Sequence, residues 1–80
     1  MKFGDWLDVT EVVGLYFVVY TKEDGDEEPL WTGKYMDIPH WIAKCKLATD
    51  LPDGALAIDY RGSLGEEYGN KPGFVVIVED

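Results

Sequence analysis

His40 and Cys45 are the one histidine and the one cysteine of the chain, and they supply a general base and a thiol nucleophile. On the helix predicted for this region they are five positions apart, which places them on roughly opposite faces and out of hydrogen-bond reach. We expect His40 to face solvent near the helix start and Cys45 to pack in the core as a small apolar residue. A single cysteine forms no internal disulfide, and this pair is too small a set for a structural zinc site.

Two further patterns resemble known sites and lack a necessary part. The glycine-rich stretch around Ser63 has neither the lysine nor the length of a phosphate loop. An alternation of acids resembles the start of a calcium loop: Asp24, Asp26 and Glu28. A loop starting there needs glycine at position 29 and glutamate at position 35, where the chain has Pro29 and Tyr35. We therefore predict no catalytic residues, no cofactor and no dedicated metal site.

Carboxylates dominate the remaining polar residues. The chain has 16 Asp and Glu against 7 Lys and Arg, a formal net charge of -9 in 80 residues. Their simplest role is to keep a small aromatic-rich domain in solution. The alternative is a partner-binding surface, which would take its carboxylates from one window at 23–28, from a line at 5–11 and from a pair at 66–67. These candidate residues are Glu23, Asp24, Asp26, Glu27, Glu28, Asp5, Asp8, Glu11, Glu66 and Glu67.

This charge also indicates the kind of partner. It repels the phosphate backbone, so we predict no direct nucleic-acid binding. Exposed tyrosines could stack bases, but too few cations accompany them to hold a backbone. A basic protein surface is the expected partner. Because duplex DNA carries one charge per ~1.7 Å of axis, acidic clusters on a rigid scaffold can act as a DNA mimic in a basic groove.

The elements that would position these residues follow from local patterns. Residues 12–21 are dense in β-branched and aromatic residues and predict a strand, and a turn at 23–29 leads into a second strand over 30–36, weakened by Gly33. A helix is predicted from Ile38 to Ala48, with an apolar face directed at the sheet: Ile38, Trp41, Ile42, Cys45 and Ala48. Two more strands follow at 55–61 and 74–78, joined by a long glycine-rich loop at 62–73.

The first fourteen residues fit two structures. Asp5 could cap a short helix with Trp6, Val9 and Val13 inward, which we favour, whereas the alternation of Leu7, Val9, Glu11 and Val13 also fits a strand. With either choice, the chain predicts a single α+β domain over residues 1–80. Its expected architecture has two layers, with one helix packed across one face of a small antiparallel β-sheet.

Bulk properties restrict the compartment. The longest uncharged apolar run, residues 12–20, is half the length of a membrane span, and acids appear too early for a signal peptide. We expect a soluble, cytoplasmic protein with no membrane contact. Nothing in the sequence fixes its oligomeric state.

In its size, acidity, exposed aromatic residues and lack of a catalytic set, the chain resembles small phage-encoded inhibitors of the anti-CRISPR and anti-restriction type. The resemblance lies in composition, since these proteins share no motif, and it transfers no functional residue. It implies a phage protein acting in the bacterial cytoplasm, a stoichiometric inhibitor of a CRISPR effector or another nucleic-acid-processing complex. The alternative is a small structural or accessory subunit that assembles through an exposed sheet edge or a tyrosine-rich face.

Overall fold

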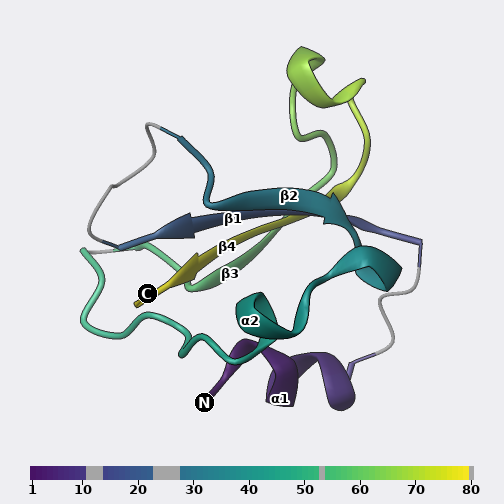
Figure 1. Ribbon diagram of the computed structural model, residues 1–80. Coiled ribbons are helices and arrows are strands. Elements are labelled where there is room, and N and C mark those ends of the chain that lie inside the picture. The colour runs from purple at the N-terminus through teal and green to yellow at the C-terminus, as the bar shows by residue number, and fades with distance from the viewer. Residues whose placement is uncertain (11–13, 23–27, 53, 80) are drawn as a thin grey trace.

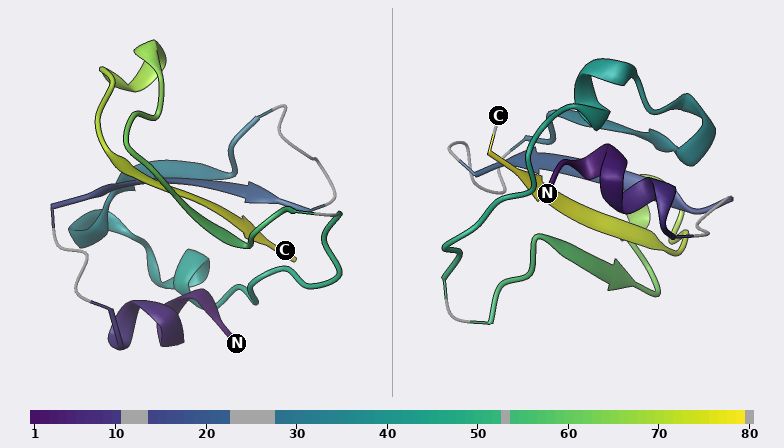
Figure 2. Two further views of the ribbon diagram at one scale, coloured as in Figure 1. Left: turned by 180° about the vertical axis from the view of Figure 1, so that it is seen from behind. Right: turned by 90° about the horizontal axis from the view of Figure 1, so that it is seen from below.

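The computed structural model describes residues 1–10, 14–22, 28–52 and 54–79. It confirms an α+β architecture of two layers, with a four-stranded sheet above two short α-helices (Figure 1). The view from below in Figure 2 shows the helices covering one face of the sheet. The elements in chain order are α1 (Phe3–Asp8), β1 (Tyr16–Thr21), β2 (Trp31–Lys34), the 3-10 turn η1 (Tyr35–Asp37), α2 (His40–Ala43), β3 (Ile58–Arg61), the 3-10 turn η2 (Glu66–Tyr68) and β4 (Gly73–Val78).

The strand order is β2-β1-β4-β3, so β1 and β4 occupy the centre of the sheet. β1 pairs antiparallel with β2, and β3 pairs antiparallel with β4, as the sequence predicts. The prediction of a wholly antiparallel sheet is wrong, because β1 and β4 run parallel from Tyr16↔Gly73 to Thr21↔Val78. β4 is apolar along most of its length, and its residues are buried or partly buried at the centre of the sheet.

The amino-terminal segment is a helix, as favoured above, but its start and its buried face differ from the prediction. Lys2 occupies the N-cap position, and the Asp5 carboxylate accepts a hydrogen bond from the Lys2 backbone N–H at 3.3 Å. Asp5 is therefore the third helical residue, where a carboxylate satisfies an otherwise free amide. Phe3 and Leu7 face the core, whereas Val9, expected inward, is 79% exposed.

The helix predicted over 38–48 is wrong in length, because α2 contains only His40–Ala43. After a turn at Lys44 and Cys45, Lys46 and Leu47 form isolated β-bridges, and backbone groups of residues 45–48 bond sideways to distant segments. Cys45 O accepts from Phe3 N at 2.9 Å, Leu47 N donates to Met1 O at 2.8 Å, and Ala48 N donates to Ile77 O at 2.9 Å. These bonds satisfy the polar backbone and tie the amino terminus to the end of β4, so no helix is needed there.

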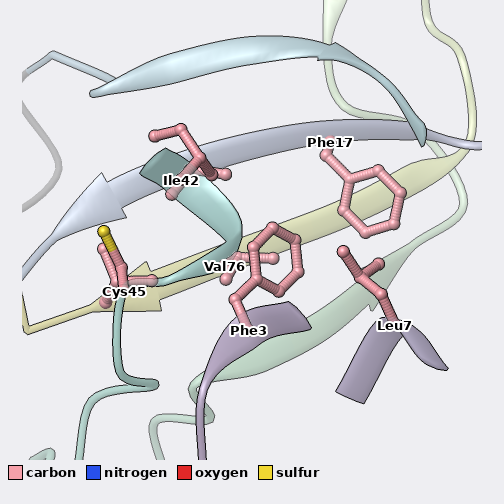
Figure 3. Close-up of a cluster of buried hydrophobic side chains, with 8 residues drawn as sticks. Phe3, Leu7, Phe17, Ile42, Cys45 and Val76 are labelled. Carbon is pink, nitrogen blue, oxygen red and sulfur yellow. The ribbon is translucent and has the colours of Figure 1, made fainter. Parts of the chain in front are cut away.

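The core lies between the helices and the lower face of the sheet. Phe3 and Leu7 from α1, Phe17 from β1, and Ile42 from α2 point toward one another in Figure 3. Phe3 and Phe17 meet edge to face, with their ring centroids 5.7 Å apart. Ile42, Cys45 and Ala48 are buried as predicted, but Trp41 is 54% exposed, so the predicted packing of Trp41 on the sheet is wrong.

Candidate docking surfaces

The described candidate acids are all exposed and fall on three elements. Asp5 and Asp8 lie on α1, Glu28 lies in the segment before β2, and Glu66 and Glu67 lie on η2. The other candidates lie outside the described residues: Glu11, Glu23, Asp24, Asp26 and Glu27.

Glu66 and Glu67 stand on a hydrogen-bonded loop between β3 and β4. Leu64 N donates to Lys71 O at 2.9 Å, which extends the hairpin beyond the two strands. Asn70 N donates to Gly65 O at 2.9 Å, and Gly69 N donates to Glu66 O at 3.1 Å, so the 3-10 turn is closed on itself. The predicted long loop therefore presents its two carboxylates on a defined turn.

Ser63 has a structural use in the same loop. Its hydroxyl donates to the Asn70 side-chain oxygen at 3.1 Å and accepts from the Gly65 backbone N–H at 3.3 Å. Asn70 adopts φ +55, a left-handed conformation that asparagine tolerates better than most residues. Both hydrogen bonds hold the loop in shape, and neither makes Ser63 a nucleophile.

The α1 acids and the η2 acids do not share a face. In Figure 1 α1 lies below the sheet, and the green turn that carries η2 projects above it; the view from behind in Figure 2 agrees. Asp5 and Asp8 also border a hollow of mixed charge, lined by Lys2, Gly4, Asp5, Asp8, His40, Ala43 and Lys44. The described acids thus form separate small clusters around the molecule.

Tyrosines pack on the upper face of the sheet beside η2. The rings of Tyr16 and Tyr68 lie 5.7 Å apart, and Lys71 Nζ lies 5.5 Å from the centroid of the Tyr16 ring. Burial raises the pKa of the Tyr68 hydroxyl, and Tyr20, Glu67 and Tyr16 raise it further by charge repulsion. The tyrosine-rich face is therefore a packed cluster that anchors the loop, with a cation on one of its rings.

His40 and Cys45 lie as the sequence predicts. His40 is exposed in the first turn of α2, and Cys45 is 9% exposed, with its thiol donating to Trp41 O at 3.3 Å. Because α2 ends at Ala43, the two residues do not share a helix.

Sequence reasoning missed a hollow between α1 and η1. It has a volume of about 390 Å³ and is lined by Gly4, Leu7, Asp8, Tyr35, Met36, Ile38 and Ala43. Met36, assigned by the sequence to the end of a strand, is 82% exposed. The sequence feature that relates to this hollow is a pair of small residues, Gly4 on α1 and Ala43 on α2. Their small size lets the two helices approach each other closely.

In the described parts of the chain, no three His, Cys, Asp or Glu side chains are grouped so that they could hold a metal ion. The same residues contain no helix with the length and apolar content needed to cross a membrane. Comparison of the chain with protein-family models, with curated proteins and with solved structures finds no match.

Proposed function

We propose that this chain is a non-catalytic acidic binding protein, a stoichiometric inhibitor that docks on a basic, nucleic-acid-binding surface of a partner such as a CRISPR effector or another nuclease complex. The observation that carries the proposal is negative charge without internal compensation. The net charge is -9, and the one ion pair within the described residues joins Arg61 Nε to Asp59 Oδ2 at 2.8 Å. Charge that is not paired within the protein remains available to a basic partner.

The arrangement of the acids supports docking by one cluster at a time. α1 and η2 lie on opposite sides of the sheet (Figure 1). A flat basic surface that contacts η2 therefore does not reach the acids of α1. Glu66 and Glu67 are the better candidates, because their turn is fixed by hydrogen bonds and anchored by the packing of Tyr68 on Tyr16. A fixed pair of carboxylates loses less conformational freedom on binding than a mobile pair.

The test begins with the full chain as bait in a bacterial lysate, followed by purification of the enriched nuclease complex and titration of its cleavage activity. We expect inhibition to be complete at a defined molar ratio and to weaken as salt rises. The double variant E66Q/E67Q should slow association several-fold. The matched control, D37N/D50N, removes the same charge at two exposed positions outside the η2 loop and should have a smaller effect.

Two results would count against the proposal. Enrichment of proteins with no role in nucleic-acid processing would exclude the inhibitor function. Equal slowing by both double variants would show that net charge acts without any local surface, and Glu66 and Glu67 would lose their assigned role.

A second candidate is an accessory subunit that assembles through a sheet edge. β2 and β3 end the strand order, so in the described parts of the chain each has one side without a neighbouring strand, and Tyr60 on β3 is 56% exposed. Such edges pair readily with other strands. Light scattering across a range of protein and salt concentrations tests this candidate: self-association that increases when salt screens the charge would support it, and a monomer throughout would exclude self-assembly.

A further inference from the structure

We infer that the hollow between α1 and η1, called here the α1–η1 groove, binds a large apolar side chain in a basic segment of the partner protein. The groove is defined by its lining residues: Gly4, Leu7, Asp8, Tyr35, Met36, Ile38 and Ala43. This inference rests on the proposed function, which supplies a basic partner, and adds a second contact that is apolar and specific.

The size and lining of the groove suit one apolar side chain. Its volume of about 390 Å³ falls within the range of small binding pockets, and its lining is mainly aliphatic and aromatic. Leu7 is buried beneath it, while Met36 is 82% exposed at its rim. Methionine adapts its shape to what it contacts, which is useful at a binding surface.

Close approach of the two helices forms one wall. A Cβ atom on Gly4 would lie 3.1 Å from the Ala43 carbonyl oxygen and 3.3 Å from the Ala43 Cβ. Gly4 and Ala43 therefore pack directly against each other, and both also line the groove beside the larger Leu7 and Tyr35.

Charge identifies the chemistry of the occupant. Among the described residues, Asp8 is the one charged residue that lines the groove, and it is exposed. The chain as a whole has a formal net charge of -9. An apolar side chain that has a lysine or arginine beside it in the partner is therefore favoured over one that has an acid beside it. A second copy of this chain brings the same negative charge and is disfavoured.

The probes are three synthetic tetrapeptides with blocked ends. One is basic and apolar, Lys-Leu-Phe-Arg; one is basic and polar, Lys-Gly-Ser-Arg; and one is acidic and apolar, Glu-Leu-Phe-Glu. Each is titrated into the full-length protein, and amide chemical shifts are followed by NMR. We expect the basic and apolar peptide to bind at least about fivefold more tightly than either of the others and to shift the amide signals of Leu7, Asp8 and Met36.

Matched variants locate the site. Met36→Gln preserves the length and charge of the side chain and should weaken binding of the basic and apolar peptide about fivefold. Leu56→Gln, at another exposed apolar position, should leave the affinity for this peptide unchanged. Asp8→Asn should reduce the salt dependence of binding. Thermal melts of all three variants establish that they are folded.

Other results would overturn the inference. Equal binding of the two basic peptides would show attraction by charge alone, and shifts that spare the groove would place the contact elsewhere. A dimer that Met36→Gln converts to a monomer would identify a second copy as the occupant. If the Met36→Gln variant captures and inhibits the partner normally, the groove has no role in docking and the proposed function is kept. If the basic and apolar peptide binds the groove but no basic partner is found, the groove is kept as a binding site and the proposed function is excluded.

Discussion

Trp41 and Ile42 are adjacent in the sequence and have opposite environments. Ile42 is fully buried in the core, while Trp41 is 54% exposed. Both were predicted to face the sheet, because a long helix from 38 to 48 would turn both toward it. In the short α2, the buried positions are set by contact with α1 and the sheet, and the larger of the two residues faces outward.

The first prediction separates these two neighbours. Ile42→Ala should lower the free energy of unfolding by about 2–5 kcal/mol, because it leaves a cavity in the core. Trp41→Ala should lower it by only about 1 kcal/mol or less, because Trp41 is already 54% exposed and loses less buried surface. Chemical denaturation of both variants measures the difference. A larger loss for Trp41→Ala would show that this ring stabilises the fold.

Gly73 has a different structural role, the close approach of two strands. It pairs with Tyr16 at the start of the parallel β1–β4 contact. A Cβ atom there would collide with the Tyr16 carbonyl oxygen and lie 2.8 Å from Leu64 Cδ1. The backbone of β1 cannot move away without breaking the centre of the sheet.

The second prediction tests this contact. Gly73→Ala should destabilise the protein by more than about 2 kcal/mol, because a central strand pair must separate to admit the methyl group. Gly62→Ala is the control, since a Cβ at Gly62 meets nothing within 4 Å. Thermal melts compare the two variants, and equal melting temperatures would contradict the close approach.

At the scale of elements, the segment after α2 shows how tertiary contacts override a local pattern. Apolar spacing predicts that the helix continues to Ala48, yet residues 45–48 bond to the amino terminus and to the end of β4. Lys46 pairs with Lys2 and Leu47 with Val78 as isolated bridges. These bonds satisfy the backbone of the segment, which still buries Cys45 and Ala48.

The third prediction concerns the acidic window that connects β1 to β2. Neutralising Glu23, Asp24, Asp26, Glu27 and Glu28 to Gln or Asn should leave stability equal or slightly higher, because five like charges within six residues repel. If the window steers docking, association with the partner should slow and become less sensitive to salt. Stopped-flow mixing measures both, and single variants should have small effects. An unchanged rate and salt dependence for the fivefold variant would reduce the window to a solubilising role.

At the scale of the whole molecule, charge and shape act together. The described acids of α1 and η2 lie on opposite sides of the sheet (Figure 1), while the apolar groove occupies one place, between α1 and η1. Long-range charge raises the rate of encounter, and a local apolar contact lengthens the life of the complex. The two surfaces would therefore serve different steps of binding.

The fourth prediction is that the protein does not bind DNA. Its charge of -9 opposes the phosphate backbone, and its 7 basic residues are dispersed along the chain. A gel shift with duplex and single-stranded DNA at physiological salt should show no complex at micromolar protein. Binding under those conditions would contradict the prediction and favour the tyrosine cluster with Lys71 as a stacking site.

Features that depend on near neighbours along the chain could be predicted from the amino-acid sequence. Dense β-branched and aromatic residues indicated strands over 12–21 and 74–78, which contain most of β1 and β4, while acids and prolines marked the turns and composition determined the net charge. It also separated His40 from the core and placed Cys45 within it. The α+β class followed from these local patterns.

Features that depend on residues far apart in the chain could not be predicted in this way, because they are set by contacts between distant segments. The parallel pairing of Tyr16 with Gly73 leaves little trace in either strand, since a central apolar strand reads the same in either direction. The sideways bonds of residues 45–48, which shorten the predicted helix, have partners near both ends of the chain. The α1–η1 groove and the opposite placement of α1 and η2 arise from the same packing, because contacts between distant segments set which faces meet and which remain open.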